Sequence, residues 1–345
     1  MNFDLLKRLC ETPSVPGREE ALRATVREIM EPLVDELRVD ALGNVIGTKR
    51  GNGKRKVMLA AHMDEIGFLV KFIDKKGFIR LQPVGGFDPR TLVAQRVLVH
   101  TAAGPLRGAL MPGVQPIHLM QGDPKPLKLE EFFVDVGLTA DEVKERVELG
   151  DPVTMDRTTE RLGNCVISKS LDDRLSLYVM FEALKAVKSH EVDIVAVATV
   201  QEEVGLRGAG PAAYSIQPDI GVALDITLAV DIPGNDEELA VTRLGEGAAI
   251  KIMDGSSISH PKLVQHFKEI AKREGIPHQL EILPRGGTDA GTIQPSRGGI
   301  PSITLSTPTR YVHTVNESAH ERDIQAAVDL LARYLEQAHT SDISY

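Results

Sequence analysis

The chain has 345 residues, a length that indicates about two domains or one domain carrying an insertion. Hydrophobic residues make up 42% and charged residues 26%, which is ordinary for a globular protein. A formal net charge of -9 without Lys/Arg tracts argues against nucleic acid or an anionic membrane as the main partner. Trp is absent and aromatic residues make up 4%, so stacking platforms for bases or sugars are scarce.

The first residues and the cysteine content bear on localisation. Residues 1–8 lack a basic stretch followed by a long apolar core, so no signal peptide is expected. No run approaches the roughly 18 apolar residues of a membrane span. Cys10 and Cys165 are too few for a disulfide framework, and we therefore expect a reducing, cytoplasmic environment.

The first part of the chain predicts helices followed by strands. Apolar residues recur at helical spacing over 3–34, with a Pro- and Gly-containing break at 12–17. Two strands are expected next, near 36–49 and 56–61.

Residues from about 68 to 160 have a different pattern. Short β-like runs alternate with Gly- and Pro-containing turns, which favours a small β-barrel or sandwich. One helix is expected near the end of this region, where Thr139 and Glu142 fit a capping box and Gly150 fits a C-terminal cap.

An α/β pattern resumes at about residue 165. The predicted elements are a helix opening at Asp172–Asp173, buried strands over 192–200 and 220–224, a helix over 261–274, a strand over 300–305 and a final helix from Ser318 to about 338. The simplest arrangement is one α/β domain, residues 1–67 and 161–345, interrupted by a β-rich domain, residues 68–160. We expect a mixed, mainly parallel sheet flanked by helices, with an inserted β-barrel-like domain.

Three apolar runs end in residues that can hold a metal. They are Val57–Ala61 before His62 and Asp64, Val192–Val200 before Glu202 and Glu203, and Ile220–Leu224 before Asp225. Such runs are typical of strands buried on both faces of a parallel sheet, where ligands bind beyond the carboxyl ends. The sequence therefore predicts one His and four carboxylates at one edge of a sheet, and a metal-dependent hydrolase.

Each group has a functional and an ordinary interpretation. A ligating His62 would donate its other ring N–H to a carboxylate such as Asp64, whereas the alternative is a solvated loop. Glu202 and Glu203 would repel unless a cation or a proton separates them, so one can bind metal while the other moves protons. The alternative for this pair is two exposed loop glutamates.

Two further residues complete a possible pair of metal sites. Asp172 is assigned as a bridge between two cations, and Asp173 as a structural or capping residue, since acids at a helix start also stabilise the helix. His313 supplies a second imidazole. Two imidazoles and three carboxylates, one of them bridging, give each cation three protein groups and an open position, as in catalytic zinc sites.

These motifs together resemble the tetrahedral, or glutamyl, aminopeptidases, a family of dinuclear metallo-aminopeptidases that includes deblocking aminopeptidases. The resemblance covers nearly the whole chain and rests on segments 62–67, 170–174, 201–205, 224–225, 286–291 and 310–313. It implies a catalytic domain that needs Zn²⁺ or Co²⁺, interrupted by a β-rich dimerisation domain. It also implies assembly of dimers into a tetrahedral dodecamer.

The resemblance assigns a role to each matching position. It implies His62, Asp172 and Asp225 on one metal and Asp172, Glu203 and His313 on the other, with Asp64 orienting His62 and Glu202 as the general base that acts on a water bound at the metal pair. The expected reaction is removal of N-terminal residues from peptides.

Two other kinds of function are kept as alternatives. Deacylation of N-acylated amino acids uses similar chemistry, whereas glycan hydrolysis needs an acid/base pair around an acetal and gives the metals no clear task. A non-catalytic scaffold would not need Glu202 and five intact ligand candidates.

The substrate pocket is less well defined by the sequence. Arg285 and Arg310 are candidates for binding an acidic P1 side chain, because Arg suits carboxylate recognition, with a salt bridge or backbone support as the alternative. Thr288 and Asp289 are further pocket candidates, and His260 either lines the pocket or starts a helix.

Overall fold

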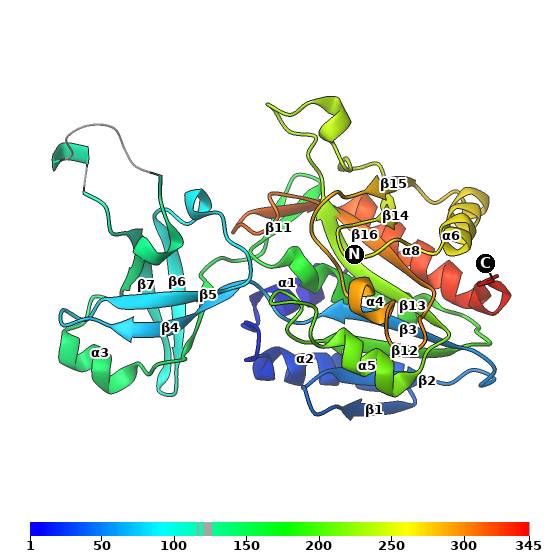
Figure 1. Cartoon of the computed structure of the whole chain (residues 1–345), viewed down its shortest axis with the longest axis horizontal. Helices are drawn as coiled ribbons and strands as arrows, with labels where there is room; N and C mark the ends of the chain where they lie inside the picture. The colour runs from blue at the N-terminus through cyan, green and yellow to red at the C-terminus, as the bar shows by residue number, and fades with distance from the viewer. Residues whose placement is uncertain (116, 120–125, 345) are drawn as a thin grey trace.

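The computed structural model describes residues 1–115, 117–119 and 126–344. Residues 116 and 120–125, which fall in the predicted insertion, lie outside this description. Figure 1 shows an elongated molecule with a small β structure at one end and a larger α/β structure at the other.

The larger part is built on a mixed sheet, to which the described residues contribute 11 strands. In spatial order they are β1 (Glu36–Val39), β2 (Val45–Lys49), β12 (Asp193–Thr199), β3 (Lys56–His62), β13 (Ile220–Leu228), β16 (Ser302–Arg310), β17 (Glu317–His320), β11 (Cys165–Ser168) and β10 (Glu160–Leu162), with β14 (Ala248–Met253) beside β16 and β15 (His278–Ile282) beside β14. The four central strands, β12, β3, β13 and β16, are parallel. Their carboxyl ends therefore lie along one edge of the sheet.

Helices cover both faces of these strands. They are α1 (Phe3–Glu11), α2 (Glu20–Met30), α4 (Leu171–Ala186), α6 (Pro261–Glu274) and α8 (Glu321–Gln337) on one face, and α5 (Ala209–Ile216) and α7 (Ala290–Ile293) on the other. Alternate residues of β3 enter different cores: Val57 and Leu59 pack with the first set of helices, whereas Met58 and Ala60 pack with the second. This double burial confirms the fold class expected from the apolar runs.

The smaller part is a closed antiparallel barrel with its own core. Its strands, among the described residues, are β4 (Gly67–Ile73), β5 (Ile79–Val84), β6 (Gln95–Thr101), β7 (Gly104–Pro112), β8 (Phe132–Asp135) and β9 (Pro152–Met155). Residues Val70, Val97, Leu110, Val134 and Val153 are buried together inside it. The barrel therefore has a hydrophobic core separate from those of the large sheet.

Several predicted boundaries were wrong for local reasons. The single strand expected over 36–49 is a hairpin, because the Asp40 side chain accepts hydrogen bonds from three successive backbone amides and turns the chain. The helix capped by Thr139 is α3 (Ala140–Arg146), and it ends at an extended Val147 before it reaches Gly150. Ser318 belongs to β17, and the side chain of His320 caps α8 instead.

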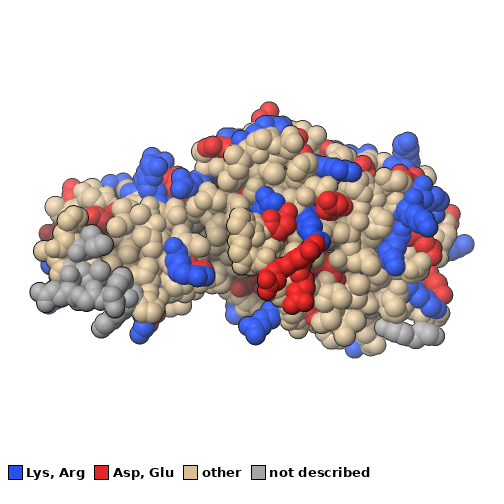
Figure 2. Space-filling view, turned by 90° about the horizontal axis from the view of Figure 1, so that it is seen from above, with Lys and Arg blue, Asp and Glu red and all other residues tan. Residues whose placement is uncertain are grey.

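Among the described residues, no helix is both long enough and apolar enough to cross a membrane. On the face drawn in Figure 2, Asp and Glu side chains are grouped near the middle.

Candidate active site

The predicted metal-binding residues meet at the carboxyl edge of the central strands. His62 is the last residue of β3, and Glu202 and Glu203 follow β12. Asp225 is not at a strand end as predicted, because β13 continues to Leu228. Pairing of β13 with β3 stops at Ala223, however, so Asp225 lies just beyond its neighbouring strand.

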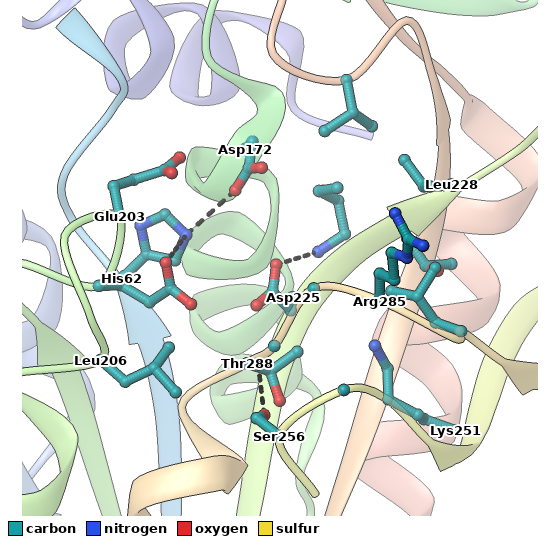
Figure 3. A pocket seen from close by; sticks show the side chains of 18 of the residues that line it. His62, Asp172, Glu203, Leu206, Asp225, Leu228, Lys251, Ser256, Arg285 and Thr288 are labelled. Carbon is teal, nitrogen blue, oxygen red and sulfur yellow. Dashed lines mark hydrogen bonds and ion pairs between the residues drawn. The ribbon is translucent and has the colours of Figure 1, made fainter. Parts of the chain in front are cut away.

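A pocket of about 550 Å³ opens at this edge (Figure 3). Among the residues that line it are His62, Asp172, Glu202, Glu203, Asp225 and His313. Strands β3 and β13, the segment after β12, the start of α4 and the turn after β16 supply these side chains. The structure thus brings together all five predicted ligands and the predicted base.

Asp172 lies between the two imidazoles. Its Oδ1 is 3.0 Å from His62 Nε2, and its Oδ2 is 3.4 Å from His313 Nε2. Glu203 Oε1 is also 3.4 Å from His313 Nε2. One carboxylate that offers a separate oxygen to each of two imidazoles is the arrangement expected of a bridging ligand.

The donor atoms form two overlapping groups compatible with a metal ion. In His62, Asp172 and Glu203, and again in His62, Asp173 and Asp225, one ligand atom per residue lies within 4.8 Å of the others. Asp173 thus lies beside the predicted ligands, whereas the sequence predicted a structural or capping role for it. Its Oδ2 accepts a hydrogen bond from the His62 amide at 3.1 Å, which also gives it a structural task.

Buried acidic atoms that lack hydrogen bonds indicate that these residues fit a cation. Asp173 Oδ1 has no hydrogen-bond partner among the described residues, and Glu203 Oε1 has none beyond its 3.4 Å ion-pair contact with His313. Burial, together with neighbouring carboxylates, raises the pKa values of Glu202 and Asp225 well above their usual range. A cluster of acids that disfavours its own ionisation is stabilised by a divalent ion.

The two imidazoles contact the same carboxylates. Burial alone would lower the pKa of His313, but Asp172 and Glu203 raise it to about 12. Burial likewise opposes ionisation of Asp172, yet hydrogen bonds from His313 and His62 bring its pKa below the usual value. A metal held by these residues would neutralise the same carboxylates, and both imidazoles would bind it in their neutral form.

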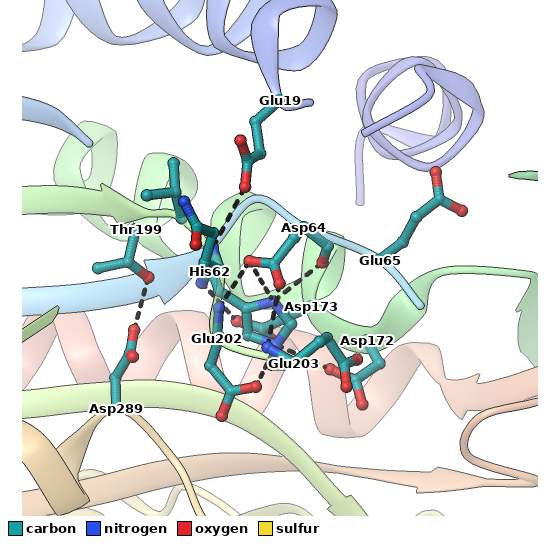
Figure 4. A network of polar contacts seen from close by, with 12 residues as sticks. Glu19, His62, Asp64, Glu65, Asp172, Asp173, Thr199, Glu202, Glu203 and Asp289 are labelled. Carbon is teal, nitrogen blue, oxygen red and sulfur yellow. Dashed lines mark hydrogen bonds and ion pairs between the residues drawn. The ribbon is translucent and has the colours of Figure 1, made fainter. Parts of the chain in front are cut away.

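Asp64 contacts the imidazole and also holds the two glutamates (Figure 4). Its Oδ1 and Oδ2 accept hydrogen bonds from the backbone amides of Glu202 and Glu203, each at 3.0 Å. His62 Nδ1 is 2.9 Å from the Asp64 backbone carbonyl and 3.6 Å from its carboxylate. The orienting bond of the imidazole is therefore made by the main chain of the same residue.

Sequence reasoning missed two buried acids around the site. Glu317 accepts hydrogen bonds from the backbone amides of Asp172 and His313. Glu65 forms ion pairs with Lys169 and Arg174 beneath the site. Glu65 follows His62–Met63–Asp64 directly, a position that could have drawn attention to it, whereas nothing in the sequence around Glu317 signals its partners.

The substrate-pocket candidates separate into two groups. Arg285 and Thr288 line the pocket. Asp289 does not line it, and its buried carboxylate accepts a hydrogen bond from Thr199. Arg310 forms an ion pair with Asp231 at 2.7 Å outside the lining. The fifth candidate, His260, is buried at the N-cap of α6 and also lies outside the lining.

Comparisons with known proteins identify the family of this chain. The family described as M42 glutamyl aminopeptidase matches residues 43–330. The lysyl aminopeptidase of Pyrococcus furiosus is 38% identical, over 100% of this chain and 99% of its own. An aminopeptidase structure from the archaeon Desulfurococcus kamchatkensis has a TM-score of 0.93 and 41% identity, and the match covers 97% of this chain and 94% of that one.

A further structural neighbour carries information on assembly. The TET1 peptidase of Pyrococcus horikoshii, described as able to assemble into a tetrahedron or a large octahedral shell, has a TM-score of 0.86. It is 30% identical, and the match covers 96% of this chain and 98% of that one. The resemblance inferred from the motifs is thereby confirmed, and the chain belongs to the M42 glutamyl aminopeptidase family and is a hydrolase of the aminopeptidase class.

Proposed function

We propose that this protein is a dinuclear metallo-aminopeptidase that removes N-terminal residues from peptides. The observation that carries the proposal is the position of Asp172, whose two oxygens lie 3.0 Å from His62 Nε2 and 3.4 Å from His313 Nε2. A carboxylate shared between two imidazoles supports two cations rather than one.

The two ions would be held by overlapping sets of ligands. His62, Asp172 and Asp225 would hold one, and Asp172, Glu203 and His313 the other, with Asp173 close to the first set. Divalent Zn or Co ions bound there would polarise a carbonyl and lower the pKa of water, which is the chemistry that peptide hydrolysis needs.

Glu202 is the proposed general base. This residue lines the pocket, is 9% exposed and has its Oε2 atom 3.9 Å from His62 Nε2. Its backbone is fixed by the bond to Asp64. A carboxylate held at the edge of the ligand cluster can accept a proton from the attacking water and return it to the leaving amine.

The acidic floor of the pocket favours a free N-terminus as the substrate group. Asp172, Glu203 and Asp225 all line the pocket, and an ammonium or amine adjacent to the scissile bond is attracted to such a cluster. An N-acyl group cancels that charge. This feature favours aminopeptidase activity over the deacylation of N-acylated amino acids.

A paired substrate assay tests this function. Unblocked peptides and their N-acetylated counterparts are incubated with metal-loaded and chelator-treated enzyme, and a β-glucan serves as a further substrate. We expect cleavage of the unblocked peptides only, lost on chelation and restored by Zn²⁺ or Co²⁺. Preferred turnover of the acylated substrates or of the glucan would refute the proposal.

We also propose a division of labour between the two parts of the chain. Residues 1–67 and 161–345 would form the catalytic domain, and residues 68–160 a dimerisation domain. Phe72, Met111 and Val114 of the barrel region are apolar and exposed, which supports contacts between copies. Assembly of dimers into a tetrahedral dodecamer is proposed by analogy with the shell described for the TET1 peptidase.

A further inference from the structure

Glu317 joins two segments that each contribute a proposed metal ligand. It is the first residue of β17, is 1% exposed, and pairs across the sheet with Ser168 of β11. Its Oε2 accepts a hydrogen bond from the Asp172 amide at 3.0 Å, and its Oε1 accepts one from the His313 amide at 2.8 Å. A single buried carboxylate therefore connects the start of α4 to the turn after β16.

Both amides belong to backbone that regular structure does not hold. His313 has a φ of 61°, a left-handed conformation that is unfavourable for a non-glycine residue. Asp172 has a φ of -76° and a ψ of 105°, outside the helical range although it is in the first turn of α4. The two hydrogen bonds that Glu317 accepts from these amides stabilise both positions.

The two positions must be matched to each other for a metal to bind between their side chains. His313 Nε2 is 3.4 Å from Asp172 Oδ2 and 3.4 Å from Glu203 Oε1. The Glu203 backbone is fixed separately, by the bond from its amide to Asp64. Loss of the Glu317 carboxylate would leave Asp172 and His313 free to move relative to Glu203.

We propose that Glu317 is a positioning residue that sets the affinity of the metal site formed by Asp172, Glu203 and His313. The inference rests on the dinuclear function proposed above. The site of His62 and Asp225 is also affected, because Asp172 is shared between the two sites. The effect there is smaller, since His62 and Asp225 are held by β3 and β13. Partners of metal ligands in comparable positions typically contribute about 10–100-fold in metal affinity.

The chain offers a matched control for a purely structural role. Asp323 is fully buried in the first turn of α8, and its two oxygens accept hydrogen bonds from the Gly245 and Gly247 amides, both at 2.7 Å. It has the same geometry as Glu317 but does not line the pocket and bonds to no proposed ligand. Asp323→Asn therefore reproduces the loss of a two-amide acceptor without touching the metal site.

The experiment titrates the metal-free enzyme with Co²⁺, using visible absorbance and calorimetry, for wild type, Glu317→Gln, Glu317→Asp and Asp323→Asn. In Glu317→Gln one amide oxygen can accept one backbone N–H, while the side-chain NH₂ faces the other donor. We expect one of the two binding steps to weaken by about 10–100-fold, and the other step to change much less. Glu317→Asp keeps a carboxyl group that can still accept one of the two hydrogen bonds and should show a smaller loss.

The outcomes separate this inference from the function on which it rests. Two Co²⁺ steps of wild-type affinity in folded Glu317→Gln or Glu317→Asp would overturn the positioning role and leave the dinuclear site intact. Equal weakening of both steps, matched by Asp323→Asn, would also overturn it, because the effect would be general destabilisation. A wild-type protein that binds one ion would refute the dinuclear function and this inference together.

Discussion

At the scale of single residues, adjacent acids have different tasks. Glu202 and Glu203 are neighbours in the sequence, and Asp64 binds both of their amides, yet only Glu203 has an oxygen within 4.0 Å of His313. Asp172 and Asp173 divide in the same way, because Asp172 lies between the imidazoles and Asp173 binds the amide of His62. In the proposed mechanism these positions decide which acid is ligand, base or support.

Glu202→Gln tests the assignment of the base. The amide keeps the shape of the side chain but cannot accept a proton, so we expect kcat to fall by roughly 10²–10⁴-fold, with metal content unchanged. The measurement is steady-state hydrolysis of an aminoacyl-anilide alongside metal analysis. Glu203→Gln is the matched control and should lose metal instead, whereas near-normal kcat in Glu202→Gln would exclude it as the base.

Arg285 is the residue on which we base P1 preference. Lys251 also lines the pocket, but it forms an ion pair with Glu281, with 2.8 Å between Lys251 Nζ and Glu281 Oε1. Arg285 has no ion pair or hydrogen bond to any other described residue, and Figure 3 shows it on the side of the pocket across from His62 and Glu203. An unpaired guanidinium facing the pocket favours an acidic P1 side chain.

A panel of aminoacyl-anilides measures this preference. We expect Glu and Asp substrates to be favoured, and Arg285→Ala to lower kcat/KM for the Glu substrate roughly tenfold, as one charged contact at an exposed position would do. The Leu substrate serves as the control and should be nearly unaffected. A wild-type preference for Leu or Lys would reject the role of Arg285.

At the scale of elements, the carboxyl edge of the sheet creates the site, and a buried ion-pair cluster supports it. Glu65, just after β3, pairs with Lys169 and with Arg174 of α4, and all three side chains are at most 4% exposed. The Glu65 carboxylate also accepts a hydrogen bond from the Ser14 amide. This cluster fixes the start of α4, from which Asp172 projects.

Glu65→Gln should therefore be destabilising. The substitution leaves two cations buried without a counter-charge, and removing one member of a buried ion pair typically costs about 3–5 kcal/mol. Chemical denaturation followed by circular dichroism gives the free energy of unfolding. Arg8→Gln, which breaks an exposed pair with Glu28, is the control and should change it by less than about 1 kcal/mol; equal effects would contradict the account.

The apolar pattern predicted the elements better than it predicted the connections between them. Strands buried on both faces could be recognised because every residue of β3 from Val57 to Ala61 is apolar. Glu317 could not be recognised, since its partners are backbone amides 145 and 4 residues away and leave no pattern in the sequence. For the same reason nothing indicated that Asp231 would pair with Arg310.

At the scale of the whole molecule, the barrel and the large sheet have separate cores, so each can serve a separate purpose. The proposed purpose of the barrel is contact between copies. Light scattering after size exclusion should show a particle of about twelve chains, or the dimers from which that particle assembles. Replacement of exposed Phe72 by Glu should shift the mass downward without loss of the fold, while a wild-type monomer at high concentration would rule out the proposed assembly.

The central claim is that two metal ions at one acidic edge of the sheet carry out aminopeptidase chemistry. The most direct measurement is metal content per chain, followed through chelation and stepwise reconstitution with Zn²⁺ or Co²⁺ while cleavage of an unblocked peptide is recorded. The account predicts about two equivalents at full activity, and loss of activity when they are removed. Full peptidase activity in a protein that retains no metal, or saturation at a single equivalent, would contradict it.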